Sequence, residues 1–157
     1  MRLIDFVNTD AIIPELEATD RNGVIRELVS SLAAHGAVDP SRMDGIAQAV
    51  IYRENQGSTG FGKGVAVPHV KHDAVTETVA TVGRSSHGID FAALDRAPVY
   101  TVVLLLSPKT DPDPHLAAME KIFRHLREVN FRRFLRQADT REKIAELIAE
   151  ADESAGG

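Results

Sequence analysis

The chain has 157 residues, of which 43% are hydrophobic and 26% charged, a composition that fits one globular domain with its own core. It has no cysteine, which excludes disulfides, thiolate zinc sites and cysteine nucleophiles, and its net charge of −5 argues against a nucleic-acid partner. The longest aliphatic run, 102–106, is too short to cross a bilayer and the N-terminus has no signal peptide, so we expect a cytoplasmic protein without membrane insertion.

The first predicted elements are helices. Asp20 is a suitable cap for a helix over 21–35, whose apolar residues fall on one face, and Gly36 ends it. The pair Asp39-Pro40 opens a second helix. That helix ends close to Arg53, so its last turn carries this arginine.

A polar, glycine-rich loop follows and leads into a short strand, 65–67, which delivers His69. Glycines leave backbone N–H groups free to approach an anion, and Arg53 adds a fixed positive charge just upstream. An imidazole placed where a strand ends and a loop begins can be exposed and nucleophilic. A glycine-lined anion site with a histidine beside it suits phosphoryl transfer onto nitrogen.

The second half of the chain predicts two further strands and three helices. Residues 75–84 form one strand, and 99–107 form a central strand buried on both faces, because nearly all its residues are β-branched or aliphatic. The helices are expected to start at Asp113-Pro114, with an apolar stripe that begins at Leu116, then around 131–135, and finally after the cap Thr140.

Strands that alternate with helices predict an α/β fold. We expect a three-layer sandwich, in which a central mixed sheet is flanked by helices on both faces. One domain covers residues 1–152, and a flexible C-terminal tail covers residues 153–157.

The histidines at positions 69 and 115 stand out by their positions in the predicted elements. His115 lies in the first turn of the helix opened by Asp113-Pro114, where free N–H groups favour bound anions and a neutral imidazole. Such a ring can donate one N–H to a phosphate oxygen. The alternative is that both are ordinary surface or capping histidines.

The same region of the chain contains weaker patterns for a metal site and for a nucleotide-binding loop. His69 and His72 are spaced for a metal, but no cysteine and no His-Glu-x-x-His motif accompanies them, so neither a metal nor a cofactor is expected. The loop is not a Walker A motif, since Gly62-Lys63-Gly64 lacks the Lys-Ser/Thr ending, and Ser58-Thr59 suit a simple turn equally well.

The string from Arg53 to His69 resembles the active-site signature of the enzyme IIA domains of the bacterial phosphotransferase system, of the fructose–mannitol and nitrogen-regulatory type. The likeness continues through Asp90-Phe91, Ala97-Pro98-Val99 and His115-Leu116, and it covers about residues 3–148.

This resemblance implies a role for each matching residue. His69 accepts the phosphoryl group through Nε2, His115 is the second active-site histidine, and Arg53 is the charge that helps to hold the group. Backbone amides and hydroxyls of the loop complete the phosphoryl-binding site, at Ser58, Thr59, Gly60 and Gly62.

The resemblance also implies partners. The donor is phosphorylated HPr, and the acceptor is an enzyme IIB domain or a regulatory target protein. Enzyme IIB of this class uses a phosphocysteine, so the absence of cysteine and of a transmembrane segment predicts a free-standing phosphotransferase. In a regulatory role it would need no small-molecule substrate. A regulatory role is favoured; the alternatives are a transport component that passes the group to a separate sugar-specific enzyme IIB, and a binding module that retains only the fold.

Overall fold

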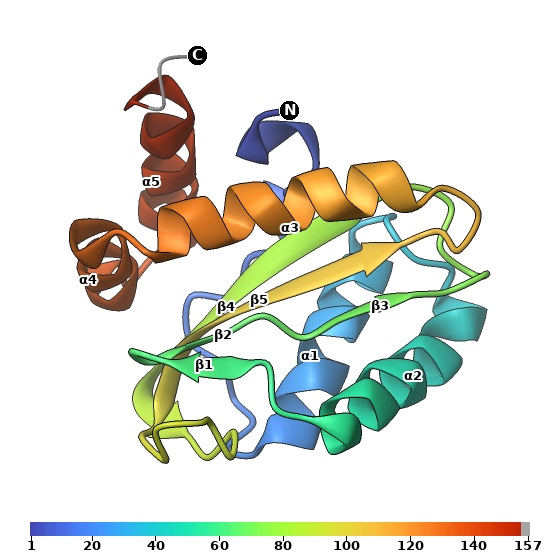
Figure 1. The fold of residues 1–157 in the computed structure, drawn as a ribbon, viewed down its shortest axis with the longest axis horizontal. Coiled ribbons are helices and arrows are strands. Elements are labelled where there is room, and N and C mark those ends of the chain that lie inside the picture. Colours follow the sequence, from blue (N-terminus) through green and yellow to red (C-terminus); the bar gives the residue numbers. More distant parts are fainter. Residues whose placement is uncertain (155–157) are drawn as a thin grey trace.

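A mixed β-sheet forms the middle layer of the molecule (Figure 1). The computed structural model describes residues 1–154, and within them the sheet has five strands. These strands are β1 (Gly60–Gly62), β2 (Val65–Ala66), β3 (His69–Lys71), β4 (Val79–Ile89) and β5 (Val99–Ser107).

The central strand is β5, which confirms the strand predicted at 99–107. It pairs in antiparallel fashion with β4 and in parallel with both β2 and β3. Every residue of β5 except Tyr100 is buried, because helices cover both faces of the sheet. In effect, β2 and β3 are one strand along β5 that is interrupted at Val67 and Pro68.

Helices lie on both faces of the sheet, which confirms the predicted three-layer α/β sandwich (Figure 1). One face carries α1 (Arg21–Ala34) and α2 (Met43–Gln56). The opposite face carries α3 (Pro112–Leu126), α4 (Val129–Gln137) and α5 (Arg141–Ser154). Short 3-10 turns complete the described elements: η1 (Leu3–Asp5), η2 (Thr9–Ala11) and η3 (Pro40–Arg42).

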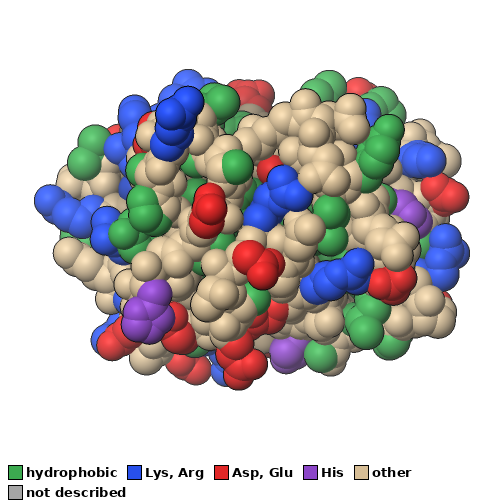
Figure 2. Space-filling view, turned by 90° about the horizontal axis from the view of Figure 1, so that it is seen from below, with side chains coloured by type: hydrophobic (Ala, Val, Ile, Leu, Met, Phe, Trp, Pro, Cys, Tyr) green, Lys and Arg blue, Asp and Glu red, His purple; other side chains and the backbone are tan. Residues whose placement is uncertain are grey.

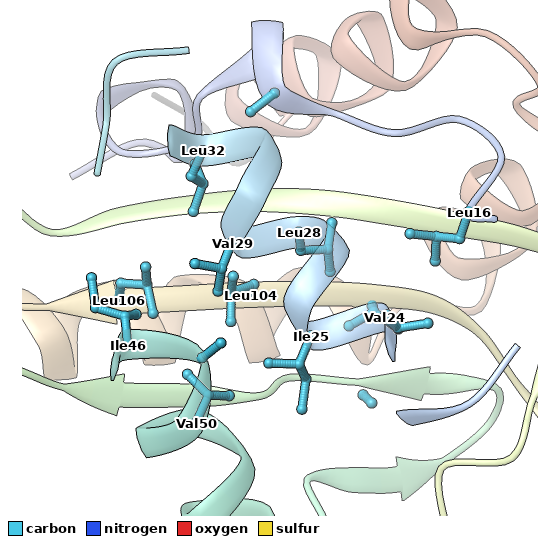
Figure 3. Close-up of a cluster of buried hydrophobic side chains, with 14 of the residues drawn as sticks. Leu16, Val24, Ile25, Leu28, Val29, Leu32, Ile46, Val50, Leu104 and Leu106 are labelled. Atoms are coloured by element: carbon cyan, nitrogen blue, oxygen red, sulfur yellow. The ribbon is translucent and has the colours of Figure 1, made fainter. Parts of the chain in front are cut away.

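Helix α1 begins and ends where the sequence predicts. The Asp20 side chain accepts a hydrogen bond from the Gly23 amide at 2.7 Å, and Gly36 follows the helix with φ +79°. Its buried face packs against β5, where Leu104 and Leu106 lie beneath it (Figure 3). Each such aliphatic side chain contributes about 1.5–3 kcal/mol when it leaves water. The buried residues of α1 are Val24, Ile25, Leu28, Val29, Leu32 and Ala33.

Two details of the glycine-rich region differ from the sequence-based expectation. Residues Gly60–Gly62, expected in a loop, form the edge strand β1 against β2. His69 begins β3 instead of following the end of a strand. The reason is Pro68, which has no N–H to donate, so that the pairing with β5 stops before it and resumes at His69.

The second half of the chain also departs from prediction at element boundaries. Strand β4 covers Val79–Ile89 instead of 75–84, since it continues through an irregular register beyond Arg84. Helix α3 begins at Pro112, and its inward face runs through Ala118 and Ile122. That phase leaves Leu116 on the outer surface, where it is 64% exposed, so its predicted inward position was wrong.

The two ends of the described chain meet. The buried Asp152 carboxylate near the end of α5 accepts hydrogen bonds from the amides of Leu3 (2.7 Å) and Ile4 (3.0 Å). Of the tail expected at 153–157, the residues Glu153 and Ser154 belong to α5, and 155–157 lie outside the described residues.

The surface on the side of α1 and α2 carries charges of both signs, interspersed with uncharged side chains (Figure 2). This mixture is typical of an ordinary solvent-facing surface. In the part of the chain that the structure describes, no helix has the length and apolar character that a membrane span requires.

Candidate functional site

The interruption between β2 and β3 fixes the ring of His69. Because the pairing with β5 is broken there, the Val67 carbonyl is left to accept a hydrogen bond from His69 Nδ1, over 2.7 Å. A ring nitrogen that faces a carbonyl must carry the proton. In the neutral ring, Nε2 therefore holds the lone pair and is the nucleophilic atom.

His115 is brought to the same place by β5 and α3. It lies in the first turn of α3, is only 6% exposed, and its ring centroid is 5.8 Å from that of His69, with the planes tilted by 48°. Its Nδ1 is 2.7 Å from the hydroxyl of Ser107, the last residue of β5. The parallel pairing of β3 with β5 places His69 opposite Leu105 and Lys71 opposite Ser107. The two strands therefore end together, and His69 lies near the end of β5 from which α3 and His115 follow.

A surface pocket of about 450 Å³ joins these histidines to basic side chains. Arg53 reaches it from the last turn of α2, where its Nη1 donates to the Gly57 carbonyl at 2.9 Å. Such a lining of cations and imidazoles favours an anionic ligand. The pocket is lined by Arg53, His69, Val70, Lys71, Lys109 and His115.

Both histidines are held neutral. Burial lowers the pKa of His69, and the Arg53 charge adds to this, against the hydrogen bond to Val67 and the Glu54 charge. Burial lowers the pKa of His115 to about 4, with further contributions from His69 and Lys71. At neutral pH the pocket therefore contains one imidazole with a free lone pair at Nε2 and a second, uncharged imidazole beside it.

The glycine-rich loop residues occupy different surroundings. Thr59 donates its amide and its hydroxyl to the carboxylate of Glu54, which is only 2% exposed. Ser58 donates its hydroxyl to the Phe91 carbonyl, and the Gly60 amide donates to Ser58. Arg53, His69 and His115 therefore line one pocket, whereas the polar groups of Ser58, Thr59 and Gly60 form hydrogen bonds elsewhere.

Gly62 has φ +98° and lies beside Asp95. Among the described residues, neither Gly62 nor any of Ser58, Thr59 and Gly60 lines the pocket of the two histidines. Their part in phosphoryl binding stays a prediction. His72, considered above as a metal ligand, accepts a hydrogen bond at Nδ1 from the Ala74 amide and so shapes the turn after β3.

Sequence reasoning missed Ser107 and Lys109 as neighbours of the site. Both follow from one tertiary fact, the parallel register that places Lys71 opposite Ser107. The only available signal was that the predicted central strand ends at residue 107, shortly before His115. Lys109 is exposed and forms an ion pair with Asp73 at 3.2 Å.

Comparison with known proteins identifies the family. Residues 5–151 match the family described as "Phosphoenolpyruvate-dependent sugar phosphotransferase system, EIIA 2". The chain belongs to this family. As an EIIA 2 domain it is a phosphocarrier of the phosphotransferase system, and this confirms the family suggested by the string from Arg53 to His69.

Similar proteins include both sugar-specific EIIA components and nitrogen regulatory proteins. A fructose-specific EIIA component from Haloferax volcanii is 31% identical over 85% of each chain. A nitrogen regulatory protein from Bradyrhizobium diazoefficiens is 30% identical over 95% of each. A fructose-specific EIIABC component from Bacillus subtilis is 28% identical over 97% of this chain, which spans only 24% of that longer protein.

Solved structures share the EIIA 2 fold. The nitrogen regulatory protein IIA-Ntr from Neisseria meningitidis superposes with a TM-score of 0.81 at 23% identity, over 92% of this chain and 97% of that one. Enzyme IIAMTL from Escherichia coli, solved in complex with phosphorylated enzyme IIBMTL, gives a TM-score of 0.75 at 20% identity, over 91% and 96%. At these identities the likeness concerns the fold.

Proposed function

We propose that this EIIA 2 domain accepts a phosphoryl group from phosphorylated HPr on Nε2 of His69. The observation that carries the proposal is the hydrogen bond from His69 Nδ1 to the Val67 carbonyl, which leaves Nε2 as the unprotonated nitrogen in a basic pocket. Family membership supports the reaction type, and the lowered pKa of His69 supports a neutral nucleophile at physiological pH.

The transfer needs no added reagent. The Nε2 lone pair of His69 attacks the phosphorus in line, the new N–P bond forms, and the N–P bond to the donor histidine breaks, with its electron pair returning to the donor nitrogen. Such transfers pass through a loose transition state, in which positioning and charge stabilisation account for most of the catalysis.

The pocket offers charges suited to this transition state. Arg53, Lys71 and Lys109 supply positive charge around the phosphoryl oxygens, and neutral His115 supplies a hydrogen-bond donor from the first turn of α3. The family signature also assigns phosphoryl binding to the amides and hydroxyls of Ser58 to Gly62. We propose that these groups contact the phosphoryl group in the phosphorylated or partner-bound protein.

We further propose that the domain acts in a regulatory role, by changing its protein partner with its phosphorylation state. A phosphoryl group brings negative charge into a pocket lined by cations, and the residue that follows the pocket-lining His115 on α3, Leu116, is exposed. A change in the sign of the local charge at this surface alters which partners dock there. The likeness to the Bradyrhizobium nitrogen regulatory protein over 95% of each chain supports this role.

A transport role is the second candidate, in which His69 passes the phosphoryl group to a separate fructose- or mannitol-class enzyme IIB. The comparable identity to the Haloferax fructose EIIA component favours it, and so does the fold shared with enzyme IIAMTL, solved with its phosphorylated IIB. In either role, we propose that the domain works in the cytoplasm, together with HPr.

Intact-mass analysis after incubation with phosphoenolpyruvate, enzyme I and HPr tests the phosphoryl acceptor. The wild-type protein should gain one phosphoryl group in an acid-labile bond, as a phosphoramidate requires, and His69→Ala should gain none. His87→Ala, which removes an exposed histidine on β4, is the matched control and should be labelled like the wild type. Labelling of His69→Ala at the wild-type rate would overturn the assignment.

A further inference from the structure

A chain of hydroxyl groups leads from β4 to the buried side of His115. The Thr78 hydroxyl, one residue before β4, donates to the Ser107 hydroxyl over 3.3 Å. The Ser107 hydroxyl is in turn 2.7 Å from Nδ1 of His115. Ser107 is fully buried, so within this chain of contacts its hydroxyl has defined partners and is not shared with bulk water.

The protons along this chain can be counted. A serine hydroxyl has one proton to donate and accepts through its lone pairs. Ser107 has the capacity to accept from Thr78 through one lone pair and at the same time to direct its own proton to Nδ1 of His115. A neutral imidazole that accepts at Nδ1 carries its proton on Nε2. The burial that keeps His115 neutral makes this tautomer the state that matters at physiological pH.

The tautomer matters because the neighbouring ring has the opposite arrangement. His69 donates from Nδ1 and holds a lone pair at Nε2, whereas a His115 ring that accepts from Ser107 carries its proton on Nε2. Phosphoryl oxygens accept hydrogen bonds and do not donate them. A neutral His115 therefore contributes to a phosphoryl group on the adjacent ring only when it presents an N–H.

We propose that Ser107, supported by Thr78, is a positioning residue that holds His115 in its Nε2–H tautomer, so that this ring donates to the phosphoryl group on His69. The second half of this statement rests on the proposed function of His69. The first half concerns the unphosphorylated protein alone, and can be measured without any transfer reaction.

Nitrogen-15 NMR of histidine-labelled, unphosphorylated protein at neutral pH reads the tautomer directly. In the wild type, His115 should show a protonated Nε2 and an unprotonated Nδ1. Ser107→Ala should shift the ring measurably toward the Nδ1–H form, and Thr78→Val should shift it less in the same direction. A wild-type His115 with the proton on Nδ1, or a tautomer that is unchanged in Ser107→Ala, would overturn the proposal.

Single-turnover labelling by phosphorylated HPr provides the second readout. Ser107→Ala should slow phosphoryl uptake by about three- to tenfold, the rate equivalent of one neutral hydrogen bond. Thr101→Val is the matched control, since Thr101 is a buried β5 hydroxyl about 20 Å further along the strand, and it should change neither rate nor tautomer. A slowed Ser107→Ala with an unaltered tautomer would mean a merely structural role and would refute the assignment.

The two proposals fail in distinguishable ways. If wild-type protein takes up no phosphoryl group while the NMR shows the expected tautomers, the function assigned to His69 fails and the role of Ser107 in fixing His115 stands. If wild-type protein is labelled normally and His115 has the other tautomer, the positioning role of Ser107 fails instead.

Discussion

Glu54 and Thr59 join α2 to the glycine-rich segment through two buried hydrogen bonds. The buried carboxylate of Glu54 accepts both the amide and the hydroxyl proton of Thr59, while its neighbour Arg53 points into the pocket of the histidines. Adjacent residues at the end of one helix thus have separate tasks: one anchors the segment that follows, and the other supplies charge to the site.

Removal of that anchor should destabilise the protein. Glu54→Ala leaves two buried donors of Thr59 without an acceptor, which costs about 1–3 kcal/mol. Urea denaturation followed by circular dichroism measures it. Glu120→Ala, which removes an exposed carboxylate paired with Arg124 on α3, should change the free energy of unfolding by less than about 0.5 kcal/mol. Equal effects of the two substitutions would contradict the anchoring role.

Loss of the second histidine should impair transfer more than folding. His115→Ala removes the neutral donor beside His69, and the rate of phosphoryl uptake should fall by about 10²-fold, the scale of one lost transition-state donor. Rapid-quench labelling with phosphorylated HPr gives the rate, and circular dichroism confirms the fold. An uptake rate within twofold of the wild type would remove His115 from the site.

The pH dependence of stability should also report on His115. Its pKa is about 4 when folded and 6.5 when unfolded, so between these values the unfolded chain binds more protons and stability falls as the pH falls. The Tm of the wild type should therefore drop between pH 7 and pH 4.5 by more than that of His115→Ala, which lacks the group. Thermal melts at both pH values decide this. Parallel losses in the two proteins would show that His115 is not the responsible residue.

Two glycines should respond to substitution in opposite directions. Gly62 has φ +98°, and a Cβ there would lie 3.2 Å from an Asp95 carboxylate oxygen, so Gly62→Val should destabilise by about 1–3 kcal/mol. It should also lose phosphorylation if the family role of this glycine holds. Gly45 lies inside α2 with open space around it, and Gly45→Ala should stabilise by about 0.4–1 kcal/mol. Denaturant melts of both variants test the contrast, and the reverse order would contradict it.

The regulatory role predicts partner exchange. Unphosphorylated protein, protein phosphorylated in vitro and His69→Ala, each immobilised, should retain different proteins from a lysate of the source cell, with His69→Ala matching the unphosphorylated form. The physical reason is the changed charge of the pocket that Arg53, Lys71 and Lys109 line. Identical partners in all three, together with rapid transfer to a purified fructose- or mannitol-class enzyme IIB, would favour the transport role.

Local signals were enough to predict α1, because Asp20 and Gly36 act within a few residues of the helix ends. They were enough for β5, whose composition requires burial on both faces. They failed for Leu116, since the inward face of α3 depends on where the helix begins and on what the sheet presents to it. The later residues of the same stripe, Ile122 and Leu126, are buried as predicted, so the apolar pattern indicated the inward face and misplaced only its first residue.

The same distinction applies to the site. Arg53, His69 and His115 were recognisable from a long, specific string and a helix start, and the structure places them around one pocket. Ser107 and Lys109 became visible only through the pairing of β3 with β5. A sequence pattern can therefore predict the residues that react. The neighbouring groups that orient them are found only once the strand register is known.

The carboxylate of Asp152 offers a way to follow the C-terminal helix. Because it holds the amides of Leu3 and Ile4, those two protons are shielded only while α5 is seated against η1. Their hydrogen-exchange rates consequently measure the opening of α5 from the opposite end of the chain. Exchange measured at the amides of Leu3 and Ile4 thus reports how often α5 detaches from the N-terminal segment.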